Sequence, residues 1–211
     1  MKTKFLALLC ASAACLAAVP AQAATVYSNG PINGTISGWT INNGYAVSNS
    51  FTLSSAATIT GFTFGGWSYP TDTFLSVDYG FSTSPDYAVT GTAAVAGGAT
   101  IPGTGFGFYE VRDYSASIAP VTLAAGTYWF ALQNAVTAQN NYAYWDVNNG
   151  PSAAYENAYG DVNGYFGGSS SSAFTLTTGS VPEPASWAMM VGGFGLIGGA
   201  MRARRTNVSF A

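Results

Sequence analysis

Several chemically reactive side chains are missing from most of this chain. It has no histidine, and its only two cysteines and two lysines lie within the first 15 residues. Ser-His-Asp and Cys-His catalysis, Schiff-base lysines, and imidazole or thiolate metal sites are therefore excluded beyond that segment. Catalysis would have to use carboxylates, as in glycoside hydrolysis by two acids. The carboxylates between residues 24 and 180 are Asp72, Asp78, Asp86, Glu110, Asp113, Asp146, Glu156 and Asp161.

Positive charge is also scarce. Charged residues make up 7% of the sequence, and Arg112 is the one basic residue between residues 24 and 180. Proteins that bind nucleic acid neutralise phosphates with Lys and Arg. Nucleic acid is therefore excluded as a partner of this region. The eight acidic residues also serve to keep a weakly charged domain soluble, so their presence alone does not indicate a glycosidase.

The N-terminus has the pattern of an export signal. Lys2 and Lys4 precede an apolar stretch over residues 5–18, and Ala21-Gln22-Ala23 forms a small-x-small cleavage pattern. The apolar stretch is shorter than the roughly 20 residues of a membrane span. We predict a secretory signal peptide over residues 1–23, whose removal also removes both cysteines and leaves a mature chain without disulfides.

A second apolar run lies near the C-terminus. Residues 185–201 contain no charge, and as a helix they would extend about 25 Å, the short end of a membrane span. The arginines that follow favour a cytoplasmic end, which leaves the domain outside. The alternative is a buried helix of the domain, but five glycines disfavour a helix in water. We predict a single transmembrane helix over 185–201.

The tail combines three features in a fixed order. A Pro-Glu-Pro sequence and a Trp-Ala pair precede the apolar run, and a basic cluster follows it, and this order resembles the PEPxxWA form of the PEP-CTERM sorting signal. The family comprises exported proteins handled by exosortase, a membrane-embedded cysteine transpeptidase-like enzyme. The residues that match are Pro182, Glu183, Pro184, Trp187, Ala188, Arg202, Arg204 and Arg205.

The resemblance implies a sorting route in a Gram-negative bacterium. The tail, residues 181–211, would hold a precursor transiently in the inner membrane. Exosortase would recognise the Pro-Glu-Pro sequence and cleave nearby, and the protein would be released or attached at the surface, often beside exopolysaccharide. The two prolines agree with this role, because they favour an extended, accessible backbone over a helix.

The region between the two ends alternates apolar and polar residues with the period of a strand. The apolar phase changes at Gly61, which indicates a bulge. We predict that residues 24–180 form an antiparallel β-sandwich, jelly-roll-like, with no helix before residue 185. The residues expected to share a face within their strand are Tyr45, Val47, Phe51 and Leu53, then Leu75, Val77, Tyr79 and Phe81, then Tyr128, Phe130 and Leu132.

Residues 141–166 hold the densest group of aromatic side chains, set among Asn, Asp and Gly. Flat rings beside amide and carboxylate groups are what sugar recognition uses. In an all-β protein, alternating Tyr and Trp can equally build the core and cross-strand pairs, and the sequence leaves both interpretations open. The candidates for sugar binding are Tyr142, Tyr144, Trp145, Tyr155 and Tyr159.

The same segment carries oxygen ligands for calcium. Its Gly150 and Glu156 fall one position short of the EF-hand spacing that starts at Asp146, so an EF-hand is excluded. A looser calcium site built from Asp146, Asn148 and Asp161 is a weak candidate. We expect no cofactor.

Together these features predict a non-enzymatic, exported protein of the cell surface or extracellular matrix, associated with exopolysaccharide or biofilm. Its partners would be the secretion machinery, an exosortase, the inner membrane and polysaccharide. The alternative is a carbohydrate-binding module that uses the aromatic residues of segment 141–166. A carboxylate-dependent glycosidase is a further, weaker alternative.

Overall fold

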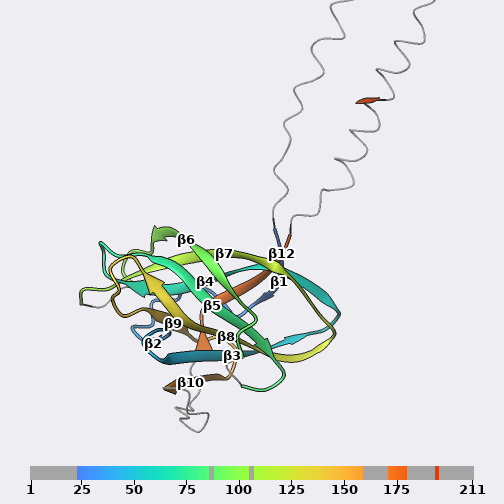
Figure 1. Cartoon of the computed structure of the whole chain (residues 1–211), viewed down its shortest axis with the longest axis horizontal. Coiled ribbons are helices and arrows are strands. Elements are labelled where there is room, and N and C mark those ends of the chain that lie inside the picture. Colours follow the sequence, from blue (N-terminus) through green and yellow to red (C-terminus); the bar gives the residue numbers. More distant parts are fainter. Residues whose placement is uncertain (1–22, 86–87, 105–106, 159–170, 180–192, 195–211) are drawn as a thin grey trace, which may run out of the picture. The chain divides into compact units, whose positions relative to one another are not determined.

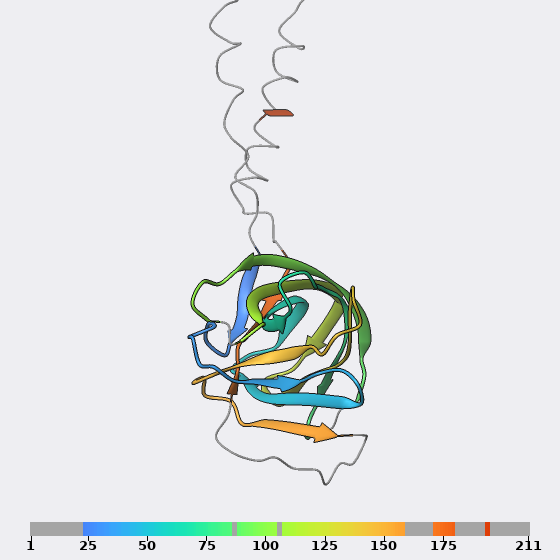
Figure 2. The same cartoon turned by 90° about the vertical axis from the view of Figure 1, so that its left-hand side faces the viewer.

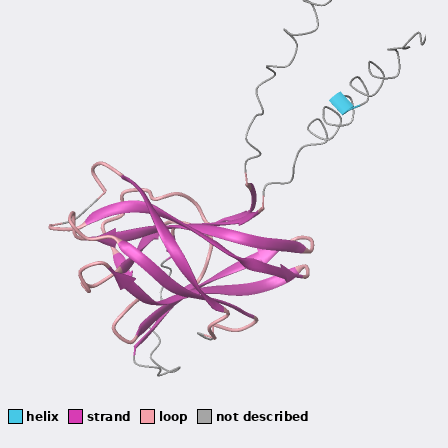
Figure 3. Ribbon diagram, turned by 45° about the horizontal axis from the view of Figure 1, so that its top comes forward, coloured by secondary structure: helices cyan, strands magenta, loops and turns pink. Residues whose placement is uncertain are grey.

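The computed structural model describes residues 23–85, 88–104, 107–158, 171–179 and 193–194. The elements of its main unit, Ala23–Gly179, are all strands in the described ranges (Figures 1 and 3). They are β1 (Ala24–Ser28), β2 (Gly38–Thr40), β3 (Tyr45–Leu53), β4 (Ala57–Ser68), β5 (Phe74–Ser82), β6 (Gly91–Thr100), β7 (Glu110–Leu123), β8 (Gly126–Thr137), β9 (Tyr144–Asn148), β10 (Ala154–Ala158), β11 (Ser171–Ser172) and β12 (Phe174–Thr178).

The predicted signal peptide and transmembrane segment lie outside the described residues, apart from Ala23, Gly193 and Phe194. Within the described part of the chain, no helix is long and apolar enough to cross a membrane. Both segments therefore stay predictions.

The strands form one antiparallel sheet that curls around the core, as the turned view shows (Figure 2). Hydrogen bonding follows the order β1-β12-β4-β7-β6-β5-β8-β3-β10, and β9 pairs with β4, β2 and β11. The prediction of an antiparallel all-β domain is confirmed. A jelly-roll sandwich would have two separate sheets. Here the strands form one continuous sheet, because β6 pairs with β5 along its first part and with β7 along its second part. Residues 91–94 of β6 pair with β5, whereas Val95, Ala96, Gly97 and Thr100 pair with β7.

The largest buried side chains of the core are aromatic. Phe62 on β4 lies edge-on to Phe130 on β8, with ring centroids 5.0 Å apart. Phe64 packs edge-on against Trp145, at 6.5 Å. Such contacts combine a large buried apolar area with favourable ring geometry. The core cluster also contains Ile, Val, Leu and Ala side chains.

The predicted change of phase at Gly61 is confirmed. The pairing of β4 with β7 shifts register between Ile59 and Gly61. A Cβ atom at Gly61 would lie 2.9 Å from the carbonyl oxygen of Ala116, closer than real Cβ contacts come. Glycine is thus needed here for the close approach of β7.

The prediction that Leu75 shares the inward face of β5 with Val77 and Tyr79 is wrong. Leu75 is 50% exposed, whereas Phe74 is buried in the core. The pairing of β5 with β8 has two irregularities, at Phe74/Ser76 and Ser76/Asp78. Each irregularity changes which side chains face inward, so the alternation that holds from Val77 onward does not extend back to Leu75.

Candidate functional site

Three tyrosines meet on the outer surface where β4, β7 and β9 come together. Tyr69 directly follows β4, Tyr109 directly precedes β7, and Tyr144 begins β9. Trp67 of β4 pairs with Val111 of β7 and also with Tyr144. This register places the three rings side by side, although they are 35 and 40 residues apart in sequence.

The rings form a connected cluster. Tyr109 lies 4.6 Å from Tyr69 between ring centroids, and 5.3 Å from Tyr144 in an edge-to-face arrangement. The Tyr109 hydroxyl is within hydrogen-bonding distance of both other hydroxyls, at 3.3 Å and 3.4 Å. Tyr142, which is 51% exposed, extends the cluster by stacking on Tyr144 at 6.2 Å. The arrangement offers several ring faces and phenol groups to solvent.

A groove of about 540 Å³ adjoins this cluster, and we call it the tyrosine groove. Burial, together with the hydrogen bond to Tyr144, raises the pKa of Tyr109. The pKa of Tyr69 is also raised, because Tyr69 is hydrogen-bonded to Tyr109. Both phenols are therefore protonated at neutral pH and able to donate hydrogen bonds. The lining includes Tyr69, Phe108, Tyr109, Glu110, Gln139 and Asn141.

The carboxylate in this groove is already paired. Arg112 donates from Nη2 to Glu110 at 3.0 Å and to the carbonyl oxygen of Pro70 at 3.1 Å. The hydrogen bond from Arg112 holds the pKa of Glu110 below its usual range. Glu110 is thus ionised at neutral pH and neutralised locally by the basic side chain beside it.

A buried carboxylate, Asp72, fixes the loop that supplies the groove's amides. Its Oδ1 accepts the backbone N–H groups of Thr73 and Gln139, at 2.8 Å and 2.9 Å, and its Oδ2 accepts Nδ2 of Asn141 at 3.0 Å. Burial alone would raise the pKa of Asp72, but these hydrogen bonds outweigh it and lower the pKa. The loop is therefore held in place by a charge that persists at neutral pH.

The predicted sugar-binding residues do not form one site. Tyr142 and Tyr144 flank the tyrosine groove, but Trp145 points the other way and is wholly buried. Its Nε1 donates to the carbonyl oxygen of Ala173 at 2.9 Å. The assignment of Trp145 as a sugar platform is corrected, because alternation along β9 puts it in the core.

Tyr155 is on β10, at another edge of the sheet, where it packs against Trp129 at 4.9 Å. Tyr159 lies outside the described residues. Sequence reasoning missed Tyr69, Phe108 and Tyr109. Each lies in a Gly- and Pro-rich turn next to a strand, and this position was the available signal for an exposed aromatic side chain. The local sequence does not show, however, that the two turns lie side by side in the fold.

The calcium candidates are engaged in other contacts. Asp146 is buried, and its Oδ1 accepts the indole N–H of Trp67 at 2.6 Å, whereas its buried Oδ2 has no hydrogen-bond partner among the residues that the structure describes. Burial raises the pKa of Asp146 to about 6, against the lowering effect of Trp67. Nδ2 of Asn148 donates to the carbonyl oxygen of Asn29, and its Oδ1 accepts the N–H of Gly150.

The third candidate, Asp161, lies outside the described residues. In the part of the chain that the structure describes, no three acidic, His or Cys side chains come together to hold a metal.

The C-terminal tail supplies the identification. A family model described as the PEP-CTERM protein-sorting motif matches residues 180–205. The chain carries this sorting motif, as predicted, and the motif implies an exported, membrane-transiting protein of a Gram-negative bacterium that is processed by an exosortase. No curated protein matches the chain.

Proposed function

We propose that this chain is a non-enzymatic component of the bacterial cell surface or extracellular matrix. The sorting motif at residues 180–205 is the observation that carries the proposal. The signal peptide, residues 1–23, directs export, and the helix over 185–201 holds the precursor in the inner membrane. Exosortase then acts at the Pro-Glu-Pro sequence and leaves the β-domain at the surface or in the exopolysaccharide matrix.

Two carboxyls of the domain, Glu110 and Asp146, agree with a non-enzymatic role. A glycosidase needs one carboxyl that is protonated at working pH, held so by a raised pKa. In the tyrosine groove, the pKa of Glu110 is lowered by Arg112. Among the described carboxyls, Asp146 has the most strongly shifted pKa, but it is buried and hydrogen-bonded to Trp67. Neither carboxyl is placed to protonate a bound glycoside.

Replacing Pro182, Glu183 and Pro184 together with alanine should trap the precursor. We expect the protein to remain in the membrane fraction and its release to fall to background, because the recognition element is lost. Cell fractionation and immunoblotting measure this. The matched control is Ser186→Ala, at a variable position of PEPxxWA, which should be processed like the parent. Normal processing of the triple variant would contradict the proposed route.

The second candidate function is carbohydrate binding through the tyrosine groove, and the groove's own chemistry favours it. Tyr69 and Tyr109 present ring faces, which pack on the apolar faces of sugar rings. Gln139 and Asn141 place amides beside them, held by Thr71 and Asp72 at 2.8 Å and 3.0 Å. Apolar platforms with a few fixed polar groups are typical of small-ligand sites.

Tyr109→Ala should weaken binding to immobilised neutral oligosaccharides by about ten-fold or more, since an aromatic anchor at the centre of a site carries over 1.4 kcal/mol. Tyr109→Phe keeps the ring and should retain most of the affinity. Tyr155→Ala, on β10, serves as the control and should bind like the parent. Equal binding by Tyr109→Ala and the parent on a glycan array would exclude the groove.

A further inference from the structure

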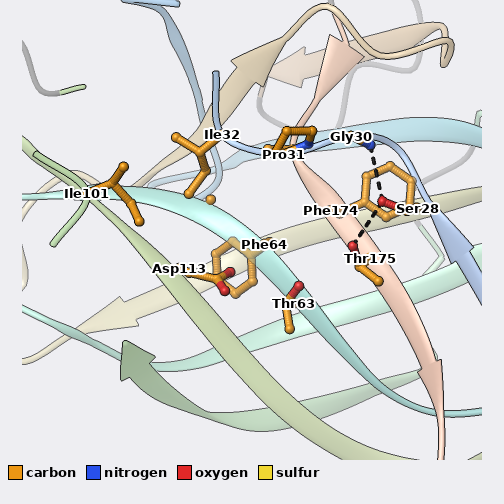
Figure 4. A pocket seen from close by; sticks show the side chains of 12 residues that line it. Ser28, Gly30, Pro31, Ile32, Thr63, Phe64, Ile101, Asp113, Phe174 and Thr175 are labelled. Atoms are coloured by element: carbon orange, nitrogen blue, oxygen red, sulfur yellow. Dashed lines mark hydrogen bonds between the residues drawn. The ribbon is translucent and has the colours of Figure 1, made fainter. Parts of the chain in front are cut away.

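A second hollow, separate from the tyrosine groove, lies on the outer face of β4, β7 and β12 (Figure 4). Its volume is about 360 Å³. Ile32 and Ile101 form its apolar walls. We call it the Asp113 groove and define it by Ser28, Ile32, Thr63, Ile101, Asp113 and Thr175.

The floor of this groove is a row of hydroxyl groups. Ser28 of β1 pairs with Thr175 of β12, and Thr175 pairs with Thr63 of β4, so the three side chains lie in one line across adjacent strands. Thr175 Oγ1 donates to Ser28 Oγ at 3.2 Å. The Thr63 hydroxyl makes no side-chain hydrogen bond within the described ranges. The row therefore offers both donors and acceptors to a hydroxylated ligand.

Beside this row stands a carboxylate that bonds to no side chain in the described part of the domain. Asp113 of β7 pairs with Gly65 of β4, whose missing side chain lets Ile32 pack onto the sheet. Figure 4 shows the Asp113 carboxylate and the Thr63 hydroxyl on the same side of the sheet. Among the described residues, no side chain bonds to the Asp113 carboxylate. Arg112, the one basic residue of the domain, is on the opposite face and bonds to Glu110 and Pro70.

We propose that the Asp113 groove binds an amino-sugar unit of a polysaccharide, with the ammonium group of the sugar at Asp113 and its hydroxyls on the row of Ser28, Thr63 and Thr175. The inference rests on the proposed association with polysaccharide and adds the class of sugar. The charge of the domain distinguishes an amino sugar from an anionic or a neutral one. An anionic sugar would be repelled by a domain with one basic residue against eight acidic ones, and a neutral sugar would leave the carboxylate without an ionic partner.

The probe is the β-1,4-linked tetramer of glucosamine, compared with the tetramer of N-acetylglucosamine, whose amides carry no charge. Isothermal titration calorimetry on the full chain in mild detergent measures both affinities. We expect the parent to bind the glucosamine tetramer, to bind the acetylated one at least about ten-fold more weakly, and to lose affinity as salt is raised. Asp113→Asn should lose about ten-fold or more in affinity for glucosamine.

The control is Asp78→Asn, which removes the same charge from β5, where the carboxylate bonds to Thr92 and Asn134. It should bind like the parent. Equal losses in the two variants would show diffuse attraction of a cation and overturn the inference, as would equal affinity of the parent for the two tetramers. If the tetramers fail but Tyr109-dependent binding of neutral oligosaccharides persists, the amino-sugar site is wrong and the tyrosine groove stands.

Discussion

Replacing Trp145 with alanine should destabilise the domain by about 3 to 5 kcal/mol, the usual cost of removing a large aromatic side chain from a core. The ring is wholly buried and packs against Phe64, Phe130 and Phe174. The substitution also removes the donor to the Ala173 carbonyl. Since domains of this size are stable by only about 5 to 15 kcal/mol, such a loss is severe.

Urea denaturation followed by tyrosine and tryptophan fluorescence would show the loss as a lower midpoint at an unchanged slope. Tyr142→Ala is the matched control, because this neighbouring ring is half-exposed and should cost less than about 1 kcal/mol. If the two variants were equally stable, Trp145 would be a surface residue and its assignment to the core would be wrong.

Asp146→Asn should change how stability depends on pH. The folded pKa of about 6 lies above the ordinary value of 3.8, so the folded state holds a proton that the unfolded state has released. The stability of the parent therefore falls as pH rises from about 4 through about 6, and stays lower above that. Asparagine cannot ionise, so the variant lacks this fall. Relative to the parent, it should gain about 2 to 3 kcal/mol between pH 4 and pH 7.5.

Denaturation at several pH values would measure this gain. Trp67→Phe gives an independent check, because it removes the hydrogen bond that holds the carboxyl's pKa down. In that variant the fall in stability should extend to higher pH. A stability difference between Asp146→Asn and the parent that stays constant with pH would show that this carboxyl is not perturbed by burial.

The alternation of side chains predicted the strands where pairing is regular. Val47 and Phe51 on β3, and Phe130 and Leu132 on β8, face the core as expected. Leu75 was misplaced because its orientation depends on register irregularities against β8, a strand that starts some 50 residues later. Register between distant strands is a tertiary property that a local pattern does not contain.

The candidate site was predictable only in part for the same reason. Tyr144 lies on one face of β9 and alternation places Trp145 on the other, but the sequence does not say which face is buried. Tyr69 and Tyr109 join the cluster only through the pairing of β4, β7 and β9. The sorting motif, in contrast, is linear, and its prediction needed no contact between distant segments.

The central claim is that this β-domain is delivered by a signal peptide and a sorting tail. Intact mass spectrometry of the protein from membrane and medium fractions tests it most directly, in an exosortase-competent bacterial host and in the same host lacking that enzyme. We predict a chain that starts at Ala24 and has lost the residues after the Pro-Glu-Pro region only where exosortase is present. Retention of the complete tail in both hosts would contradict the account.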